Sequence, residues 1–371
     1  MDSRDSVSLK VAGRSYVGWT NVSVVTDLKS LFRSFSASGS RRIDGGGVAK
    51  VEFHVGDSVE VFIGADKVIT GLVTKVDVVY KSSSVSITVQ GMGRLWAMCT
   101  SALPLGVPRS YENMPLPRLL ETIAGHFGVR VVSTVQVLDK ESMSFSSEDT
   151  VGEKLKGFLK RKSILLTEDA EGRLVIEKAQ SSGTACEHIE SGKNILNGQK
   201  TDDAQGLYSL YVVYGQGANP DSTRSVQDNQ LRYGYKGSLR QIRVLGKKQT
   251  GNATLTDVRA RARLLYANSE YSVSTLTYTL RGFRQSNGDL WIPNQMVTVK
   301  DSLLDIDGKY LIIGVTYEIS STGSTTKLTL QSPLALLPTE LESAEQKAKA
   351  STVASNLNSI GQVGSADWTR S

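Results

Sequence analysis

The chain of 371 residues has a mass of 40.2 kDa and carries 43 Lys and Arg against 37 Asp and Glu, a formal charge of +6. This length predicts two or three domains. A composition that is 39% hydrophobic and 22% charged excludes disorder, collagen and coiled coil for the bulk of the chain. No apolar run reaches the roughly 18 residues of a membrane helix, so we expect no stable membrane insertion. The polar start, residues 1–5, indicates no secretory signal.

Cysteine and histidine are scarce. Two cysteines, Cys99 and Cys186, are too few for a disulfide-stapled scaffold, which favours reduced, buried thiols. Three histidines are few for an enzyme that transfers protons. The pI of about 9.1 is mildly basic, but a net charge of +6 over this length is a low charge density and favours an acidic partner only weakly.

The first hundred residues predict an all-β meander. Apolar and polar residues alternate with period two between turns rich in Gly, Asp and Ser, which is typical of strands with one buried face. The strands are expected at 7–11, 16–19, 22–25, 58–63, 71–80 and 85–90. Short strands at this spacing usually form a small barrel or sandwich, so residues 1–103 are predicted to be a β-barrel-like module.

Residues 104–190 change to an α/β pattern and are predicted to be a small insert. A helix is expected over 118–127 with Gly128 as its C-cap, followed by a strand over 129–135. Thr150 and Glu153 have capping-box spacing before a second helix over 154–161. A hairpin over 163–177 completes the insert.

Residues 191–337 again show strand-like patterns and are predicted to be a second β-barrel-like module, which can be built from discontinuous segments. Strands are expected at 207–215, 295–299, 310–319 and 326–331, with an exposed loop over 217–237 and one helix over 256–267. Residues 338–371 are predicted to be a tail, helical over 340–358 and then flexible unless a partner orders it.

The two β regions share an internal echo. A shift of 241 positions places residues 72–90 over 313–331 without a gap and keeps the alternation through both strands and the turn. Any two amphipathic hairpins of equal length would match similarly, so duplication and coincidence both stay open. If the chain is duplicated, a trimer would present six similar modules around one axis.

Motifs that carry chemistry are weak. Gly91-Met92-Gly93 lacks the third glycine and the βαβ setting of a dinucleotide fingerprint, which favours a tight turn. Cys186-Glu187-His188 with Glu190 lacks a second Cys/His pair for a metal. The carboxylate pairs Glu168-Asp169 and Asp202-Asp203 are expected in polar turns, unlike those of a glycosidase cleft. The sequence therefore predicts no catalytic, cofactor-binding or metal-binding residues, no cofactor and no enzyme activity.

Basic residues cluster between 224 and 263, with Tyr233 and Tyr235 interleaved. Such a span could contact phosphate, but charge runs more often mark a solvated or subunit-facing surface. The candidate site, a channel lining or an intersubunit cluster, consists of Arg240, Arg243, Lys247, Lys248, Arg259 and Arg263.

The order of several short stretches resembles the baseplate hub proteins of contractile-tailed, Mu-like bacteriophages and prophages. The resemblance covers residues 7 to 335. The stretches that carry it are 13–19, 56–64, 70–71, 152–155, 192–196, 209–217 and 291–294.

The resemblance implies a β-rich α+β fold and a homotrimeric ring. Such a ring meets a sixfold tail tube on one side, seats a threefold spike on the other and leaves an axial channel for DNA. The implied partners are a second and third copy of the chain, a separate spike protein, the tail tube and other baseplate proteins. The implied location is the virion tail baseplate, assembled in the bacterial host cytoplasm.

Two other functions remain open at this stage. One is a nucleic-acid-binding module that uses the basic span, and the other is a tail-associated hydrolase of cell-wall glycan.

Overall fold

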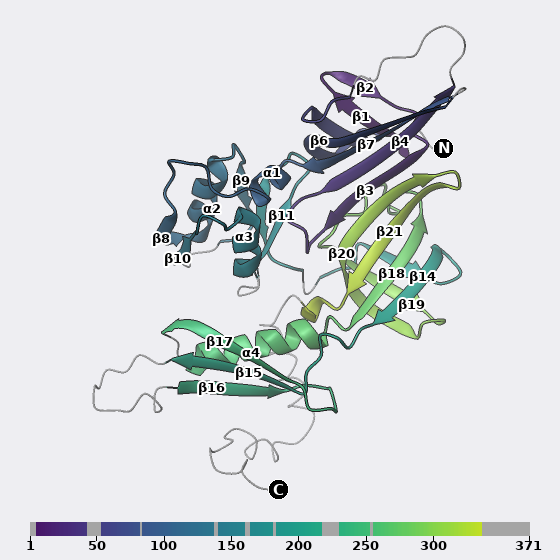
Figure 1. Cartoon of the computed structure of the whole chain (residues 1–371). Helices are drawn as coiled ribbons and strands as arrows, with labels where there is room; N and C mark the ends of the chain where they lie inside the picture. The colour runs from purple at the N-terminus through teal and green to yellow at the C-terminus, as the bar shows by residue number, and fades with distance from the viewer. Residues whose placement is uncertain are drawn as a thin grey trace.

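The structure, a computed structural model, describes residues 5–42, 53–81, 84–136, 140–159, 164–180, 183–216, 230–252 and 255–335. It is a β-rich α+β protein, as predicted, with two halves of one large sheet, an α/β insert beside the first half and a small α/β domain below the second (Figure 1).

The first half of the sheet, here the first module, contains β1 (Val7–Val11), β2 (Arg14–Tyr16), β3 (Asn21–Asp27), β4 (Ser34–Arg42), β5 (Ser58–Ile63), β6 (Asp66–Lys81) and β7 (Ser84–Gly93). The second module contains β13 (Glu187–Glu190), β14 (Ile195–Asp202), β18 (Ser274–Arg281), β19 (Met296–Asp301), β20 (Ile306–Ser320) and β21 (Gly323–Gln331).

These strands form one 13-stranded sheet, and the described strands do not close into a barrel. The pairing order is β14-β18-β21-β20-β3-β4-β7-β6-β5-β1-β2, with β19 on β20 and β13 on β19. The expected barrel-like closure of each module is therefore absent from the described pairing. The physical reason is that β3 extends the sheet by pairing with β20 of the other module.

The two modules repeat the same strand order. The series β3-β4-β7-β6-β5 of the first module corresponds to β14-β18-β21-β20-β19 of the second. One strand departs from this match, because β1 pairs antiparallel with β5 whereas β13 pairs parallel with β19.

The hairpins at the centre of each module match residue by residue with an offset of 239. Lys81 pairs with Ser84 and Ser320 pairs with Gly323, so the tight turns coincide. The register also shifts at the same place, between Val73 and Lys75 in β6 and between Ile312 and Gly314 in β20. The sequence echo is therefore real in the structure, but its offset of 241 was wrong by two positions.

Both modules contribute to one hydrophobic core. Alternate residues of β1, β5, β6 and β7, such as Leu9, Val61 and Val89, pack in the same cluster as Tyr278 and Leu328 of the second module. Period-two alternation places these side chains on one face, and burial of that face is the main stabilising contribution.

The insert has its own core and begins with a short helix that the sequence pattern did not reveal. Its elements are α1 (Leu95–Cys99), β8 (Ser110–Pro115), α2 (Leu116–Gly125), β9 (Val131–Ser133), β10 (Lys140–Ser144), α3 (Val151–Leu159), β11 (Leu165–Glu168) and β12 (Leu174–Glu177). The Glu153 N–H donates to Thr150 Oγ1 at 3.3 Å, which confirms the predicted cap of α3. The predicted C-cap of α2 was displaced, because the helix ends at Gly125 with His126 as its C-cap, and Gly128, with φ +66°, follows two residues later.

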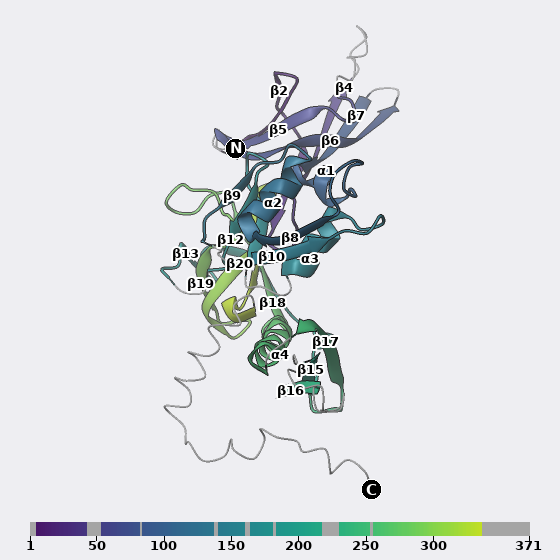
Figure 2. The same ribbon diagram turned by 90° about the vertical axis from the view of Figure 1, so that its left-hand side faces the viewer.

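A separate small α/β domain, here called the basic domain, interrupts the second module. It contains β15 (Leu210–Gln216), β16 (Gln230–Lys236), β17 (Val244–Asn252) and α4 (Leu255–Glu270). Helix α4 packs on the three-stranded sheet through Val258 and Ala262, which meet Val213. In both views the basic domain lies at the opposite end of the molecule from the first module (Figures 1 and 2).

Two local predictions were wrong. Part of the expected loop over 217–237 is strand β16, and residues 217–229 lie outside the described residues. Gly91 and Gly93 are not a turn but strand positions in β7, where a Cβ would overlap the Phe35 ring or the Glu168 carboxylate. The predicted tail, 338–371, also lies outside the described residues.

Candidate functional site: the joint between the two modules

The joint is an antiparallel strand pair. Six residues of β3 pair with six residues in the second half of β20, from Asp27 with Gly314 to Val22 with Ile319. Val22, Val24, Tyr317 and Ile319 are all buried at this seam. Strand pairing and shared burial therefore join two halves that are far apart in sequence.

A loop of the second module contacts the first module next to this strand pair. Arg284 Nη1 lies 2.8 Å from Asp66 Oδ2 on β6, and Arg284 Nη2 donates to the Ile63 carbonyl at 3.4 Å. The Asp5 carboxylate accepts from the Phe283 N–H at 3.3 Å. The Phe283 ring in turn packs edge-on against Tyr317, with ring centroids 5.4 Å apart.

Glu168 connects the insert to the first module and is only 4% exposed. Its carboxylate accepts the backbone N–H groups of Arg33 and Leu95, each at 2.8 Å. Arg33 Nε donates to the Glu168 carbonyl at 2.8 Å, and Arg33 Nη1 donates to the Val68 carbonyl at 2.6 Å. Burial raises the pKa of the Glu168 carboxyl to about 7, although the two N–H groups oppose this effect.

The expectation that Glu168 lies in a polar turn was therefore wrong, and Gly93 is the reason that it can be buried. A side chain at Gly93 would occupy the place of the carboxylate. Asp169, the other member of the pair, does lie in the turn, where it binds Arg173 Nε at 2.6 Å.

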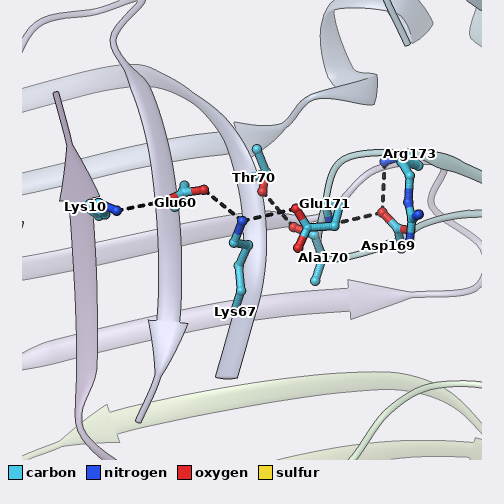
Figure 3. A network of polar contacts seen from close by, with 8 residues as sticks. All are labelled: Lys10, Glu60, Lys67, Thr70, Asp169, Ala170, Glu171 and Arg173. Carbon is cyan, nitrogen blue, oxygen red and sulfur yellow. Dashed lines mark hydrogen bonds and ion pairs between the residues drawn. The ribbon is translucent and has the colours of Figure 1, made fainter. Parts of the chain in front are cut away.

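A network of charges covers the outside of the contact between the insert and the first module (Figure 3). Lys67 Nζ on β6 lies 2.8 Å from Glu60 on β5 and 3.1 Å from Glu171 on the β11–β12 turn. The Thr70 hydroxyl donates to the Ala170 carbonyl at 2.7 Å. The charge pairs lower the pKa of Glu60 and raise that of Lys67. This network fixes the insert against the first module.

Asn294 connects the insert to the second module. It adopts φ +67°, a region that asparagine tolerates, and its side chain donates to Glu177 Oε2 at 2.8 Å and to the Lys178 carbonyl at 2.9 Å. Its Oδ1 accepts the Gln180 N–H at 2.9 Å. The insert is thus attached to both modules.

The six basic candidates all lie in the basic domain, but they do not form one cluster. Lys247 and Lys248 are exposed on β17, Arg240 is exposed in the segment before it, and Arg263 is half-buried on α4. Arg243 Nη1 donates to the carbonyls of Gln205 and Leu207, and its guanidinium lies 4.4 Å from the centre of the Tyr208 ring. Arg259 lies 5.3 Å from the centre of the Tyr233 ring.

No group of three or more potential metal ligands occurs within the described ranges. Cys186, Glu187 and His188 line a shallow hollow of about 510 Å³ together with Thr298 and Lys309. The Glu187 carboxylate accepts the Ser286 N–H at 2.8 Å, and His188 Nε2 lies 3.4 Å from Glu190. Burial raises the pKa of the Cys186 thiol to about 11 and that of Cys99 to about 12, and both thiols are free of disulfides.

Among the described helices, none has the length and apolar character needed to cross a bilayer.

Two family models match the chain at its two modules. The Mu phage baseplate assembly protein GpP-like N-terminal model matches residues 6–93, which span β1 to β7. The model for the fourth domain of Mu phage baseplate assembly protein GpP matches residues 254–339, which span α4 and the strands β18 to β21.

One curated relative and two solved structures extend this similarity to most of the chain. The baseplate hub protein gp44 of Escherichia phage Mu is 25% identical over 324 residues, 83% of this chain and 82% of that protein. The 43 kDa tail protein of prophage MuSo2 from Shewanella oneidensis is 21% identical, with a TM-score of 0.77 over 89% of this chain and 99% of its own. A tail protein from Neisseria meningitidis MC58 is 19% identical, with a TM-score of 0.76 over 89% and 98%.

The residues that form the joints escaped the sequence analysis for different reasons. Glu168, Arg33 and Arg284 belong to no motif, and their partners are distant in sequence. Asn294 lies in one of the stretches that carried the family resemblance. The resemblance marked this residue as important but did not indicate what it does. The most direct sequence signal for the joint was the repeated hairpin, because β20 of that hairpin forms the joint with β3.

Proposed function

We propose that the chain forms the homotrimeric hub of a phage tail baseplate, a structural role that its similarity to Mu phage baseplate proteins supports. In this proposal three copies close into a ring, and each copy contributes its two modules. The ring adapts a sixfold tail tube to a threefold spike and leaves an axial channel through which DNA passes. Assembly takes place in the bacterial host cytoplasm.

The observation that carries the proposal is the repeated strand order of the two modules. Two similar modules in each of three chains give six similar surfaces around one axis. A threefold ring can then present nearly equivalent contacts to a sixfold neighbour, whereas its other face keeps only threefold symmetry. The curated relative in phage Mu is named a baseplate hub protein, which supports the same role.

The partners in this proposal are other copies of the chain, a spike protein, the tail tube and further baseplate proteins. The exposed Lys247 and Lys248 of the basic domain are proposed to face the channel or a neighbouring subunit. A dedicated nucleic-acid-binding function and a cell-wall hydrolase receive less support, because the matched families and the curated relative are baseplate proteins and none is named as an enzyme.

Light scattering of the purified full-length chain at micromolar concentration tests the proposal. A hub predicts a particle of three times the 40.2 kDa chain mass. A particle with the mass of one chain, unchanged up to tens of micromolar, would contradict it.

A further inference from the structure

Each module has one strand edge that is equivalent to an edge of the joint but has no partner among the described strands. In the second module, the second half of β20 pairs with β21 on one side and with β3 on the other. In the first module, the equivalent half of β6, residues 75–81, pairs with β7, and no second partner is present among the described strands. Likewise β14, the equivalent of β3, pairs with β18 alone within the described part of the chain.

Two exposed side chains on one face of β6 are apolar, although their equivalents on β20 are buried. With the offset of 239, Val78 corresponds to Tyr317 and Tyr80 corresponds to Ile319. Val78 is 43% exposed and Tyr80 is 80% exposed, whereas Tyr317 and Ile319 are 3% and 6% exposed. An open strand edge flanked by exposed apolar residues is a surface that natural proteins normally cover.

We propose that β14 of one copy pairs antiparallel with residues 75–80 of β6 in the neighbouring copy, so that the contact between copies repeats the β3–β20 joint within each chain. The proposal rests on the proposed ring and names the segments that close it. Each chain carries one β14 edge and one β6 edge, so the contact is head-to-tail, and three such contacts close a ring of three.

The pairing within each module fixes the register. Val24 lies opposite Phe35 on β4 and Tyr317 on β20. Phe35 on β4 pairs with Gly91 on β7, and Leu276 on β18 pairs with Leu330 on β21. Gly91 and Leu330 are equivalent at the offset of 239, so Phe35 and Leu276 are equivalent as well. Lys200 lies opposite Leu276 and is therefore the equivalent of Val24. Lys200 of one copy is thus expected opposite Val78 of the next.

Two of the pairs that this register creates have matching size or charge. Gly198 falls opposite Tyr80, so the ring meets a position without a side chain. Asp203, which follows β14 and whose N–H donates to the Val273 carbonyl at 3.0 Å, falls opposite Lys75 with the opposite charge. Opposite charges across a strand pair are favourable and like charges are not.

Cysteine cross-linking tests the pairing directly. The double variant Val78→Cys/Lys200→Cys is oxidised and run on a non-reducing denaturing gel. The two positions lie seven strand spacings apart in the sheet of one chain, so a bond between them joins different chains. We expect a ladder of one, two and three linked chains that ends at three.

The matched control is Val79→Cys/Lys200→Cys. Residue 79 is one position along the strand and its side chain points to the opposite face, so at least tenfold less cross-linked product is expected under the same conditions. Each single variant controls for Cys99 and Cys186 and should give no three-chain product.

The outcomes separate this inference from the proposed ring. A trimer by light scattering whose double variant gives no more cross-link than the control overturns the strand pairing and leaves the ring standing. Cross-linking by the Val78→Cys variant alone would indicate two β6 edges face to face and would also overturn it. A chain that stays monomeric at all concentrations overturns the ring and the pairing together.

Discussion

The second halves of β6 and β20 have the same place in the fold and opposite surroundings. Residues 314–319 of β20 lie between two strands, whereas residues 75–80 of β6 have one strand partner among the described residues. The apolar character of Val78 and Tyr80 is not needed to hold one described chain together. The comparison teaches that the same repeated strand serves an internal joint in one module and an external contact in the other.

The largest predicted effect separates these two positions by stability. Ile319→Ala removes a buried side chain from the joint and should lower the free energy of unfolding by about 2–5 kcal/mol. Tyr80→Ala at the equivalent position of β6 should change it by less than about 0.5 kcal/mol in the dilute chain. Urea denaturation at low protein concentration measures both, and equal losses would contradict the comparison.

The next effect concerns the contact of the insert with the first module. Glu168→Gln leaves one of two buried N–H groups, those of Arg33 and Leu95, facing an amide NH₂ instead of an oxygen. At about pH 5 the expected loss is about 1–3 kcal/mol in the free energy of unfolding. Glu171→Gln, three residues along in the exposed network, is the matched control and should cost at most about 1 kcal/mol. A neutral Glu168→Gln variant would show that the two N–H bonds contribute nothing.

The same carboxyl should give stability a pH dependence of known sign. Its pKa is near 4.5 in the unfolded chain and is raised to about 7 in the fold. Between these values the folded state binds more protons, so this group's contribution is complete below about pH 4.5 and is lost as the pH rises towards 7. Denaturation midpoints of the native chain and of Glu168→Gln, compared from pH 5 to 8, should converge as the pH rises. Parallel curves would contradict this role for Glu168.

The smallest effect concerns the surface network of Figure 3. Lys67→Met removes both ion pairs of Lys67, but the partners are partly solvated, so the expected loss is at most about 1 kcal/mol. The loss should shrink as salt is raised from 0.05 to 0.5 M, because salt screens such pairs. A loss of several kcal/mol that is insensitive to salt would mean that the network is more important to the contact between the insert and the first module than its exposure suggests.

Most elements that were predicted from the sequence have apolar residues that repeat strongly on one face, although β18, which has the same alternation, was missed. The central hairpins, α2, α3 and α4 were all expected, because buried alternation or helical periodicity marks them. Strand β14 was missed because its residues from Leu196 to Asp202 are exposed and largely polar, so they carry no alternation. The offset of the repeat was missed by two because a slip of two residues keeps the same faces buried.

The candidate site was less predictable than the fold. The basic residues were selected by charge, yet Arg243 is engaged with two carbonyls and the Tyr208 ring of its own domain. Glu168 was taken for a turn residue because its neighbours are polar, whereas its burial depends on Gly93 and on backbone groups of Arg33 and Leu95. Contacts between residues more than 70 positions apart leave no local pattern in a single sequence.

The most direct test of the account is an electron-microscopic projection of the purified particle along its symmetry axis. A ring of three chains, each with two similar modules, predicts an open centre surrounded by six lobes of similar size. A compact particle with no central opening, or a ring with three lobes only, would contradict the claim that the two modules act as equivalent parts of one ring.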